Sequence, residues 1–327
     1  MRILLSRTDR IGDLVLSTPA IASVRASFPQ AHITMVTSPY NHVVMERNGD
    51  VDELVDLPRA VRPAAFGARF RGYDLAIALA PRAADLRLVG ATRASVRVGY
   101  TYVRRYVARL SAPLYVNRLM LSEADPRLCE RRPDLVVRHE VEQLLALVAL
   151  AGATQRVVRL RLDLLDADRA RVAQVEPGSI VLHLGERWMR EGSSFASTVA
   201  LLRALQRLGR PVAVTVSDEC RGDAPALRSA LGDLPILGGL GFHAWAAAFE
   251  RAGCVVTVDT GATHVASAVR RPTVVLFEHR YFHLNSQEWA PYGVPCASIR
   301  KPATEDEPAL ARCRDEIIHA VTELLER

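Results

Sequence analysis

Three short segments of the sequence combine charged side chains with a glycine, as sites for proton transfer or phosphate binding do. The first, RTDRIGD at residues 7–13, follows a short apolar run. Gly12 permits a tight turn, and Asp13 would then project from the junction of a strand and a helix. A carboxylate there suits a general base. It equally suits the positive end of the following helix, and the spacing alone favours that second interpretation.

The second segment, DTGATH, follows the apolar run Val255–Val258. The free N–H groups at the start of the helix that follows, together with the threonine hydroxyls, would bind a phosphate, and His264 would add a donor. The alternative is ordinary helix capping by Asp259 or Thr260, with His264 packed in the core. Residue chemistry alone leaves both interpretations open.

The third segment, HLGERWMREG at residues 183–192, also follows an expected strand. Arg187 and Arg190 are placed to clamp a diphosphate through their planar guanidinium groups. The alternative is a solvated loop in which Trp188 covers the core.

Other patterns are weaker. Residues 50–52 spell DVD, but they lie in a polar turn, and Glu278, His279 and His283 lack the helical spacing of a zinc site. We therefore expect no metal and no cofactor. The chain has neither the three glycines of a dinucleotide fingerprint nor a Walker loop. Without a helix-turn-helix or zinc-finger pattern, nucleic acid is not an expected partner.

Charge and composition indicate the number of domains, the kind of partner and the compartment of the protein. The chain has 327 residues, 49% of them hydrophobic, which is enough for two domains. Residues 1–165 carry a net charge of +8 and the remainder −2, which favours an anionic partner for the first half. Five scattered cysteines suggest free thiols in a reducing compartment. With no apolar run long enough to span a bilayer, we expect a cytoplasmic protein, at most peripheral to a membrane.

Strands alternate with helices in two series, which predicts an α/β fold with two doubly wound domains joined near residues 153–178. We expect helices at Pro19–Ser27, capped by Ser17 or Thr18, and at Tyr40–Arg47. Residues 100–137 read as irregular, 138–150 as an amphipathic helix and 307–327 as a terminal helix. Ligands of such sheets bind beyond the carboxyl ends of the strands, and two facing domains would place the site in the cleft between them.

Two of the segments together carry a family resemblance. Residues 3–20, ILLSRTDRIGDLVLSTPA, resemble the opening of glycosyltransferase family 9, the lipopolysaccharide heptosyltransferases. Residues 258–268, followed by Pro272 and WAPYG at 289–293, look like that family's nucleotide-sugar motif. The helix start RHEVE at residues 138–142 also fits, and the resemblance extends from residue 1 to about residue 300.

The resemblance implies a GT-B fold, with an acceptor-binding Rossmann-like domain at 1–160 and a nucleotide-sugar-binding one at 161–327, the terminal helix being free to pack back on the first. It implies an inverting transfer from ADP-heptose without a metal, with Asp13 as the base. Thr260 and Gly261 would hold the diphosphate, with Asp259 and His264 beside them, and Glu219 would bind the ribose. The acceptor would be an anionic, Kdo-bearing inner-core glycolipid at the inner membrane surface.

The sequence also departs from the family pattern. Leu184 stands where the family usually has proline, and the loop after it lacks the usual lysine, for which Arg187 or Arg190 would substitute. The usual FGPT is replaced by FEHR at 277–280. These changes leave open a different nucleotide-sugar donor. Two further alternatives are a non-catalytic nucleotide- or glycan-binding relative and a nucleotide-sugar epimerase of the same two-domain architecture. The candidates for contacting an anionic acceptor are Arg59, Arg62, Arg104, Arg105 and Arg118.

Overall fold

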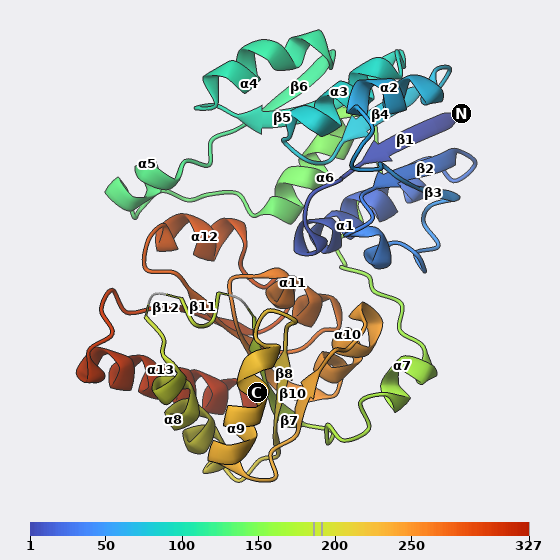
Figure 1. Ribbon diagram of the computed structural model, residues 1–327. Coiled ribbons are helices and arrows are strands. Elements are labelled where there is room, and N and C mark those ends of the chain that lie inside the picture. The colour runs from blue at the N-terminus through green and yellow to red at the C-terminus, as the bar shows by residue number, and fades with distance from the viewer. Residues whose placement is uncertain (186, 191, 327) are drawn as a thin grey trace. The chain divides into compact units, whose positions relative to one another are not determined.

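The computed structural model describes residues 1–185, 187–190 and 192–326, and it divides the chain into two α/β units (Figure 1). These are Met1–Leu162 and Asp163–Arg327. Each is built on one six-stranded sheet in which neighbouring strands pair in parallel. The predicted pair of Rossmann-like domains is confirmed, and in each sheet the carboxyl ends of the strands share one edge.

The first unit has the strand order β3-β2-β1-β4-β5-β6. Its strands are β1 (Arg2–Ser6), β2 (His32–Thr37), β3 (Glu53–Asp56), β4 (Leu75–Ala78), β5 (Val96–Tyr102) and β6 (Arg118–Ser122). Its α-helices are α1 (Ile11–Ser27), α2 (Pro63–Gly67), α3 (Ala83–Ala91), α4 (Tyr106–Ser111), α5 (Pro126–Arg131) and α6 (Glu140–Leu150). Its 3-10 turns are η1 (His42–Val44), η2 (Ala68–Phe70) and η3 (Ala112–Leu114).

The second unit has the strand order β12-β11-β10-β7-β8-β9. Its strands are β7 (Ser179–Leu184), β8 (Val212–Val216), β9 (Ile236–Gly238), β10 (Ala252–Val258), β11 (Thr273–Phe277) and β12 (Cys296–Arg300). Its helices are α7 (Asp166–Ala170), α8 (Phe195–Gln206), η4 (Arg221–Asp223), α9 (Ala224–Leu231), α10 (Phe242–Glu250), α11 (Gly261–Ala268), α12 (Phe282–Glu288) and α13 (Glu307–Glu326).

Helix α1 corrects the sequence prediction at the place that matters most for chemistry. It begins at Ile11 rather than at Pro19, so Pro19 lies inside the helix and Asp13 in its first turn. Proline has no N–H for the carbonyl one turn before it, which normally breaks a helix. Here the Thr18 hydroxyl donates to the Val15 carbonyl at 2.7 Å and supplies the missing hydrogen bond. Ser17 and Thr18 therefore support the helix from within instead of capping it.

Other segments also differ from expectation. Residues 100–137 contain the end of β5, α4, β6 and α5, and the predicted helix Tyr40–Arg47 shrinks to the single turn η1. Strands β9 and β12 and helix α12 were not predicted. Strand β6, RLMLS, lies at the sheet edge, and only Ser122 of it is buried. Its apolar run is only three residues long, whereas a central parallel strand is recognised by a longer one.

The terminal helix α13 packs within its own unit. Cys313, Ile317, Val321 and Leu324 join the core formed by strands β7, β8, β10 and β11 with helix α8. The amphipathic spacing of these residues, at intervals of three and four, explains why one face of the helix is covered. Among the described residues, no helix is both long and apolar enough to cross a membrane.

The role of Thr18 is testable by substitution. Its hydroxyl also accepts from the Arg161 N–H at 3.1 Å, so Thr18→Val would leave two polar backbone groups without their partner. We expect the free energy of unfolding to fall by about 2 kcal/mol, measured by denaturant titration. The matched control is Thr322→Val, whose hydroxyl bonds only its own helix at Ile318, and it should cost clearly less. Equal losses in the two variants would contradict the compensating role.

Candidate active site

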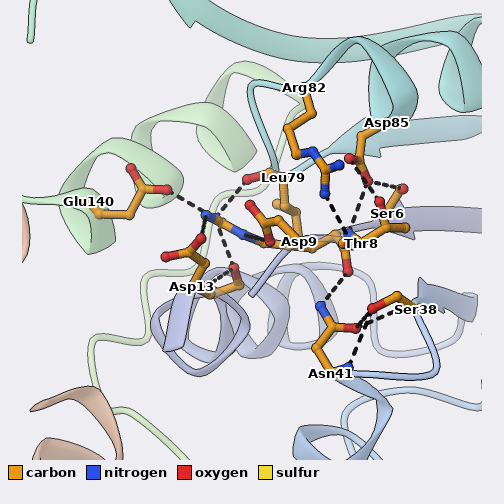
Figure 2. A network of polar contacts seen from close by, with 12 residues as sticks. Ser6, Thr8, Asp9, Asp13, Ser38, Asn41, Leu79, Arg82, Asp85 and Glu140 are labelled. Carbon is orange, nitrogen blue, oxygen red and sulfur yellow. Dashed lines mark hydrogen bonds and ion pairs between the residues drawn. The ribbon is translucent and has the colours of Figure 1, made fainter. Parts of the chain in front are cut away.

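The candidate site of the first unit is organised around Arg7, which directly follows β1. Its side chain is buried, and its Nη1 donates to the Leu79 carbonyl at 2.8 Å and to Glu140 Oε1 at 2.9 Å. Its Nε donates to Asp9 Oδ1 at 3.1 Å. Figure 2 shows Asp9, Asp13 and Glu140 converging on this guanidinium from the loop after β1, from α1 and from α6. A buried cation is thus matched by carboxylates from separate elements.

Asp13 lies at the open side of this cluster. Its Oδ2 is 3.7 Å from Arg7 Nη2, and its side chain keeps 19% exposure. Burial raises the pKa of its carboxyl from the usual 3.8 to about 7. Arg7 opposes that rise, whereas the negative charges of Asp9 and Glu140 add to it. A carboxylate whose pKa lies near neutrality, and which still reaches solvent, has the properties of a general base.

Glu140 supports the cluster from the first residue of α6. It is fully buried, and its Oε1 accepts from Arg7 and from the Tyr100 hydroxyl at 2.7 Å. Burial raises the pKa of Glu140, while Arg7 opposes the rise. The sequence placed Glu140 in a family-like helix start but gave it no role. Its hydrogen bonds fix the orientation of the guanidinium beside Asp13.

Asp85 fixes the backbone of the same loop. It is buried on α3 and accepts from the Ser6 hydroxyl at 2.7 Å and from the Thr8 N–H at 3.1 Å. Burial raises its pKa to about 6, and Asp9 contributes to the rise. Sequence reasoning missed Asp85, although a carboxylate in the first turn of a helix after a strand is a usable signal. Gly12 lies within α1 and is buried, so it does not form the predicted turn.

In the second unit, Thr260 occupies the N-cap of α11, and its hydroxyl accepts weakly from the Ala262 N–H at 3.4 Å. Gly261 is the first residue of that helix. His264 is 4% exposed and its ring centre lies 6.3 Å from that of Trp289. The capping interpretation is therefore realised in the structure, and His264 is mostly packed. The start of α11 remains the place where a phosphate would meet backbone N–H groups.

Arg187 is the arginine that the structure brings to this helix start. Its Nη1 donates to the Asp259 carbonyl at 2.9 Å and lies 3.5 Å from Asp259 Oδ2. Arg190 is exposed, and its backbone N–H closes a turn onto the Arg187 carbonyl at 3.4 Å. Trp188 is buried, as the alternative interpretation of this loop required, and Glu186 and Glu191 lie outside the described residues.

Lys301, the only lysine of the chain, is bonded to the backbone of the loop that carries Arg187. Its side chain is buried, and its Nζ donates to the carbonyls of Arg187 at 2.8 Å and Trp188 at 3.2 Å. Sequence reasoning missed Lys301, although a single lysine in a chain with 41 arginines was a signal. Lys301 directly follows β12, and its ammonium group is directed at the backbone of this loop.

Glu219 is exposed in the turn after β8. The neighbouring Ser217 side chain lowers the pKa of Glu219, so this carboxyl is ionised at neutral pH. His183, at the end of β7, is buried with its Nδ1 2.9 Å from the Thr215 hydroxyl. Burial lowers the pKa of His183 to about 4, which keeps it neutral. The ionised carboxylate at this edge is an exposed hydrogen-bond acceptor.

The five arginines proposed for an acceptor divide into two groups. Arg59 and Arg62 follow β3, and Arg104 and Arg105 follow β5, so all four lie at the carboxyl edge of their sheet, where Asp13 also lies. All four are exposed. Arg118 begins β6 and donates to the Leu150 carbonyl at 2.8 Å. Arg118 therefore lies at the opposite, amino edge of the sheet, away from the other four candidate arginines.

The two aspartates of the DVD segment at residues 50–52 are bonded to neighbouring groups of the first unit. Asp52 accepts from the Ile33 N–H at 2.7 Å and from Arg25, and Asp50 lies 3.4 Å from Arg161. Over the ranges that the structure describes, no group of three or more His, Cys, Asp or Glu side chains is arranged to hold a metal ion.

The raised pKa of Asp13 predicts how stability depends on pH. Its pKa is higher in the folded state than in the unfolded state, so the protonated carboxyl favours folding, and this contribution is lost as the pH rises through about 7. We expect Asp13→Asn to be more stable than the parent above that pH and to lose less stability between pH 4 and 8, measured by thermal unfolding.

The control for this measurement is Asp134→Asn. Asp134 is exposed, and a hydrogen bond from Arg132 lowers its pKa, so its contribution has the opposite sign and is lost as the pH falls. That variant should gain nothing at alkaline pH. An Asp13→Asn protein no more stable than the parent near pH 8 would contradict the raised pKa.

Comparisons with known proteins agree with the fold and the residue patterns. The family model of glycosyltransferase family 9 (heptosyltransferase) matches residues 193–315. No curated protein matches the chain by sequence. A glycosyltransferase family 9 structure from Veillonella parvula shares 18% identity, with a TM-score of 0.73, over 99% of this chain and 97% of its own.

Two structures from Escherichia coli are also similar. ADP-heptose lipopolysaccharide heptosyltransferase II shares 17% identity with a TM-score of 0.74, over 99% of this chain and 98% of its own. Heptosyltransferase WaaC with ADP shares 18% identity with a TM-score of 0.68, over 99% of each chain. These similarities show the fold. Together with the family match they agree with the resemblance to glycosyltransferase family 9: residues 193–315 match the model of this family, and the chain has the fold of the heptosyltransferases.

Proposed function

We propose that the protein is an inverting heptosyltransferase that moves heptose from ADP-heptose to an anionic inner-core glycolipid, with Asp13 as general base. The observation that carries the proposal is the Asp13 carboxylate, partly exposed beside buried Arg7 with a pKa of about 7. Such a group is ionised often enough to accept a proton and basic enough to hold it.

In the proposed reaction, an acceptor hydroxyl gives its proton to the Asp13 carboxylate while its oxygen attacks the anomeric carbon of the donor. The bond from that carbon to the diphosphate oxygen breaks on the opposite face, so the configuration inverts and ADP leaves. Arg7 limits the pKa rise at Asp13 and holds it in place, since it contacts both Asp13 and Glu140. No metal ion takes part in this scheme.

Three features support donor binding by the second unit. The start of α11, at Thr260 and Gly261, offers backbone N–H groups to a diphosphate. Arg187 stands against Asp259 at that helix start and adds positive charge. Glu219 is the proposed acceptor for ribose hydroxyls. Solved relatives have been described with ADP and with an ADP-heptose analogue, and the donor assignment for this chain rests on that similarity.

The acceptor assignment rests on charge. Arg59, Arg62, Arg104 and Arg105 are exposed after strands of the first unit, at the sheet edge that carries Asp13. A phosphorylated or carboxylated glycolipid would find compensating charge there, whereas a neutral sugar would gain nothing from it.

The catalytic role is tested by Asp13→Asn. With ADP-heptose and a heptose-deficient core acceptor, we expect kcat to fall by about 10²–10⁴-fold, because the amide accepts no proton. The parent rate should rise with pH up to about 7 and then level, since the ionised form is active, and the variant should lack this dependence.

Two controls make this result specific. Binding of ADP, measured by calorimetry, should be unchanged in Asp13→Asn, which separates a lost base from a lost fold. Substituting Glu142, on the same helix as Glu140 but paired with Arg156, to Gln should leave the rate intact. A turnover rate of Asp13→Asn equal to that of the parent would contradict the assignment of Asp13 as the base. Thermal stabilisation by UDP- or GDP-sugars but not by ADP-heptose would contradict the assignment of ADP-heptose as the donor.

The supporting role of Lys301 is tested by Lys301→Met, which keeps the volume and removes the two hydrogen bonds to the Arg187 loop. We expect the Kd for ADP to rise by about tenfold, because a loop with unsatisfied carbonyls loses its bound conformation. The matched control is Arg312→Gln, which removes an exposed charge from the same unit. If both variants bind ADP like the parent, Lys301 has no part in donor binding.

A further inference from the structure

The segment formed by α4 and η3 exposes its large apolar side chains. Tyr106 is 65% exposed, Val107 83%, Leu110 77% and Leu114 79%. Tyr106, Leu110 and Leu114 follow one another at intervals of four, so they line one side of a helical segment, with Val107 beside them. These four residues are called the α4 face below.

The buried side of the same segment carries small residues. Ala112 is fully buried, and Ala108 and Ser111 are partly buried. A surface helix that packs only against the core of its own domain buries its large apolar residues and exposes polar ones. The reversed arrangement in α4 is therefore not explained by the stability of the unit, and it marks a surface that meets an apolar partner.

The charge around the α4 face specifies the kind of partner. Residues 86–122 contain seven arginines and no Asp or Glu. Arg104, Arg105 and Arg109 lie on or next to α4 and are all exposed. Arg105 is stacked over the Tyr102 ring at 4.5 Å, and Arg104 lies 3.3 Å from Asp125. Apolar side chains interleaved with arginines suit the boundary between lipid headgroups and acyl chains of an anionic bilayer.

The position of α4 in the fold agrees with this partner. The helix follows β5 directly, so it begins at the carboxyl edge of the sheet, the edge that carries Asp13 (Figure 1). A bilayer contacted there would present lipid-linked sugars to the edge where the candidate base lies.

We propose that the α4 face docks the protein on an anionic phospholipid bilayer, with its apolar side chains entering the interface and Arg104, Arg105 and Arg109 contacting lipid phosphates. The inference deepens the proposed function, since a glycolipid acceptor resides in a membrane. Vesicle binding is measured without donor or acceptor, so its failure leaves the transfer reaction untouched, and loss of transfer leaves docking untouched.

The test is flotation of the purified full chain with vesicles of phosphatidylcholine containing phosphatidylglycerol, and with vesicles of phosphatidylcholine alone. We expect binding to the anionic vesicles, weakening as salt is raised, and little binding to the neutral ones. Val107→Asp should reduce the apparent affinity by about tenfold or more, because it places a charge in the interface. Arg109→Gln should reduce it by about fivefold.

Matched controls are available for both changes. Val136 is 87% exposed and lies outside the α4 face, so Val136→Asp makes the same substitution elsewhere on the same unit and should bind like the parent. Arg207→Gln removes an exposed arginine from the second unit and should also bind like the parent. Circular dichroism and thermal unfolding of all four variants should match the parent, because every substituted side chain is exposed.

Several results would overturn the proposal. They are no binding to anionic vesicles, equal binding to neutral ones, and equal loss in Val107→Asp and Val136→Asp. A fourth is a dimer in solution, detected by light scattering, that Val107→Asp dissociates. In that case the α4 face is covered by a second copy of the chain rather than by lipid.

Discussion

The burial of Arg7 is the constraint on which the chemistry of the first unit depends. A guanidinium removed from water needs opposite charge and hydrogen-bond acceptors on several sides, and leaving it unmatched would cost several kcal/mol. The acceptors come from the end of β4, from α1 and from α6. The guanidinium therefore joins elements that are distant in sequence, and the position of Asp13 follows from where they meet.

The same cluster explains why Asp13 is basic. Three carboxylates, Asp9, Asp13 and Glu140, lie around one guanidinium, so its charge is shared among them. Burial and the remaining negative charge raise the pKa of Asp13, and Arg7 moderates the rise. This arrangement is unfavourable for folding at neutral pH, since an ionised carboxylate is held in a poorly solvated place. Groups tuned in this way are typical of functional sites, where a fold tolerates a local cost.

The second unit uses a related device with a different cation. Lys301 is buried at the end of β12, and its ammonium group is bonded to backbone carbonyls of the loop after β7. The bonds fix the loop that carries Arg187, which in turn contacts Asp259 at the start of α11. In both units a buried cation orders a loop at the carboxyl edge of a parallel sheet, where substrates of this fold class bind.

The sequence by itself determined the α/β class, the two Rossmann-like units and the loops that matter, because alternating apolar strands and helices leave a local periodic signal. It also singled out Asp13 and the Asp259–His264 turn, since glycine and polar residues after strands are recognisable locally. It misplaced the start of α1, because a proline normally ends a helix, and only the hydroxyl of Thr18 at the Val15 carbonyl reverses that rule.

Only the tertiary structure decided which groups meet. Glu140 reaches Arg7 across 133 positions of the chain, and Lys301 reaches the Arg187 carbonyl across 114. Long-range pairs of this kind leave no periodic or spacing signal in a single sequence. The raised pKa of Asp13 has the same origin, because desolvation and the field of neighbouring charges exist only once distant elements are packed together.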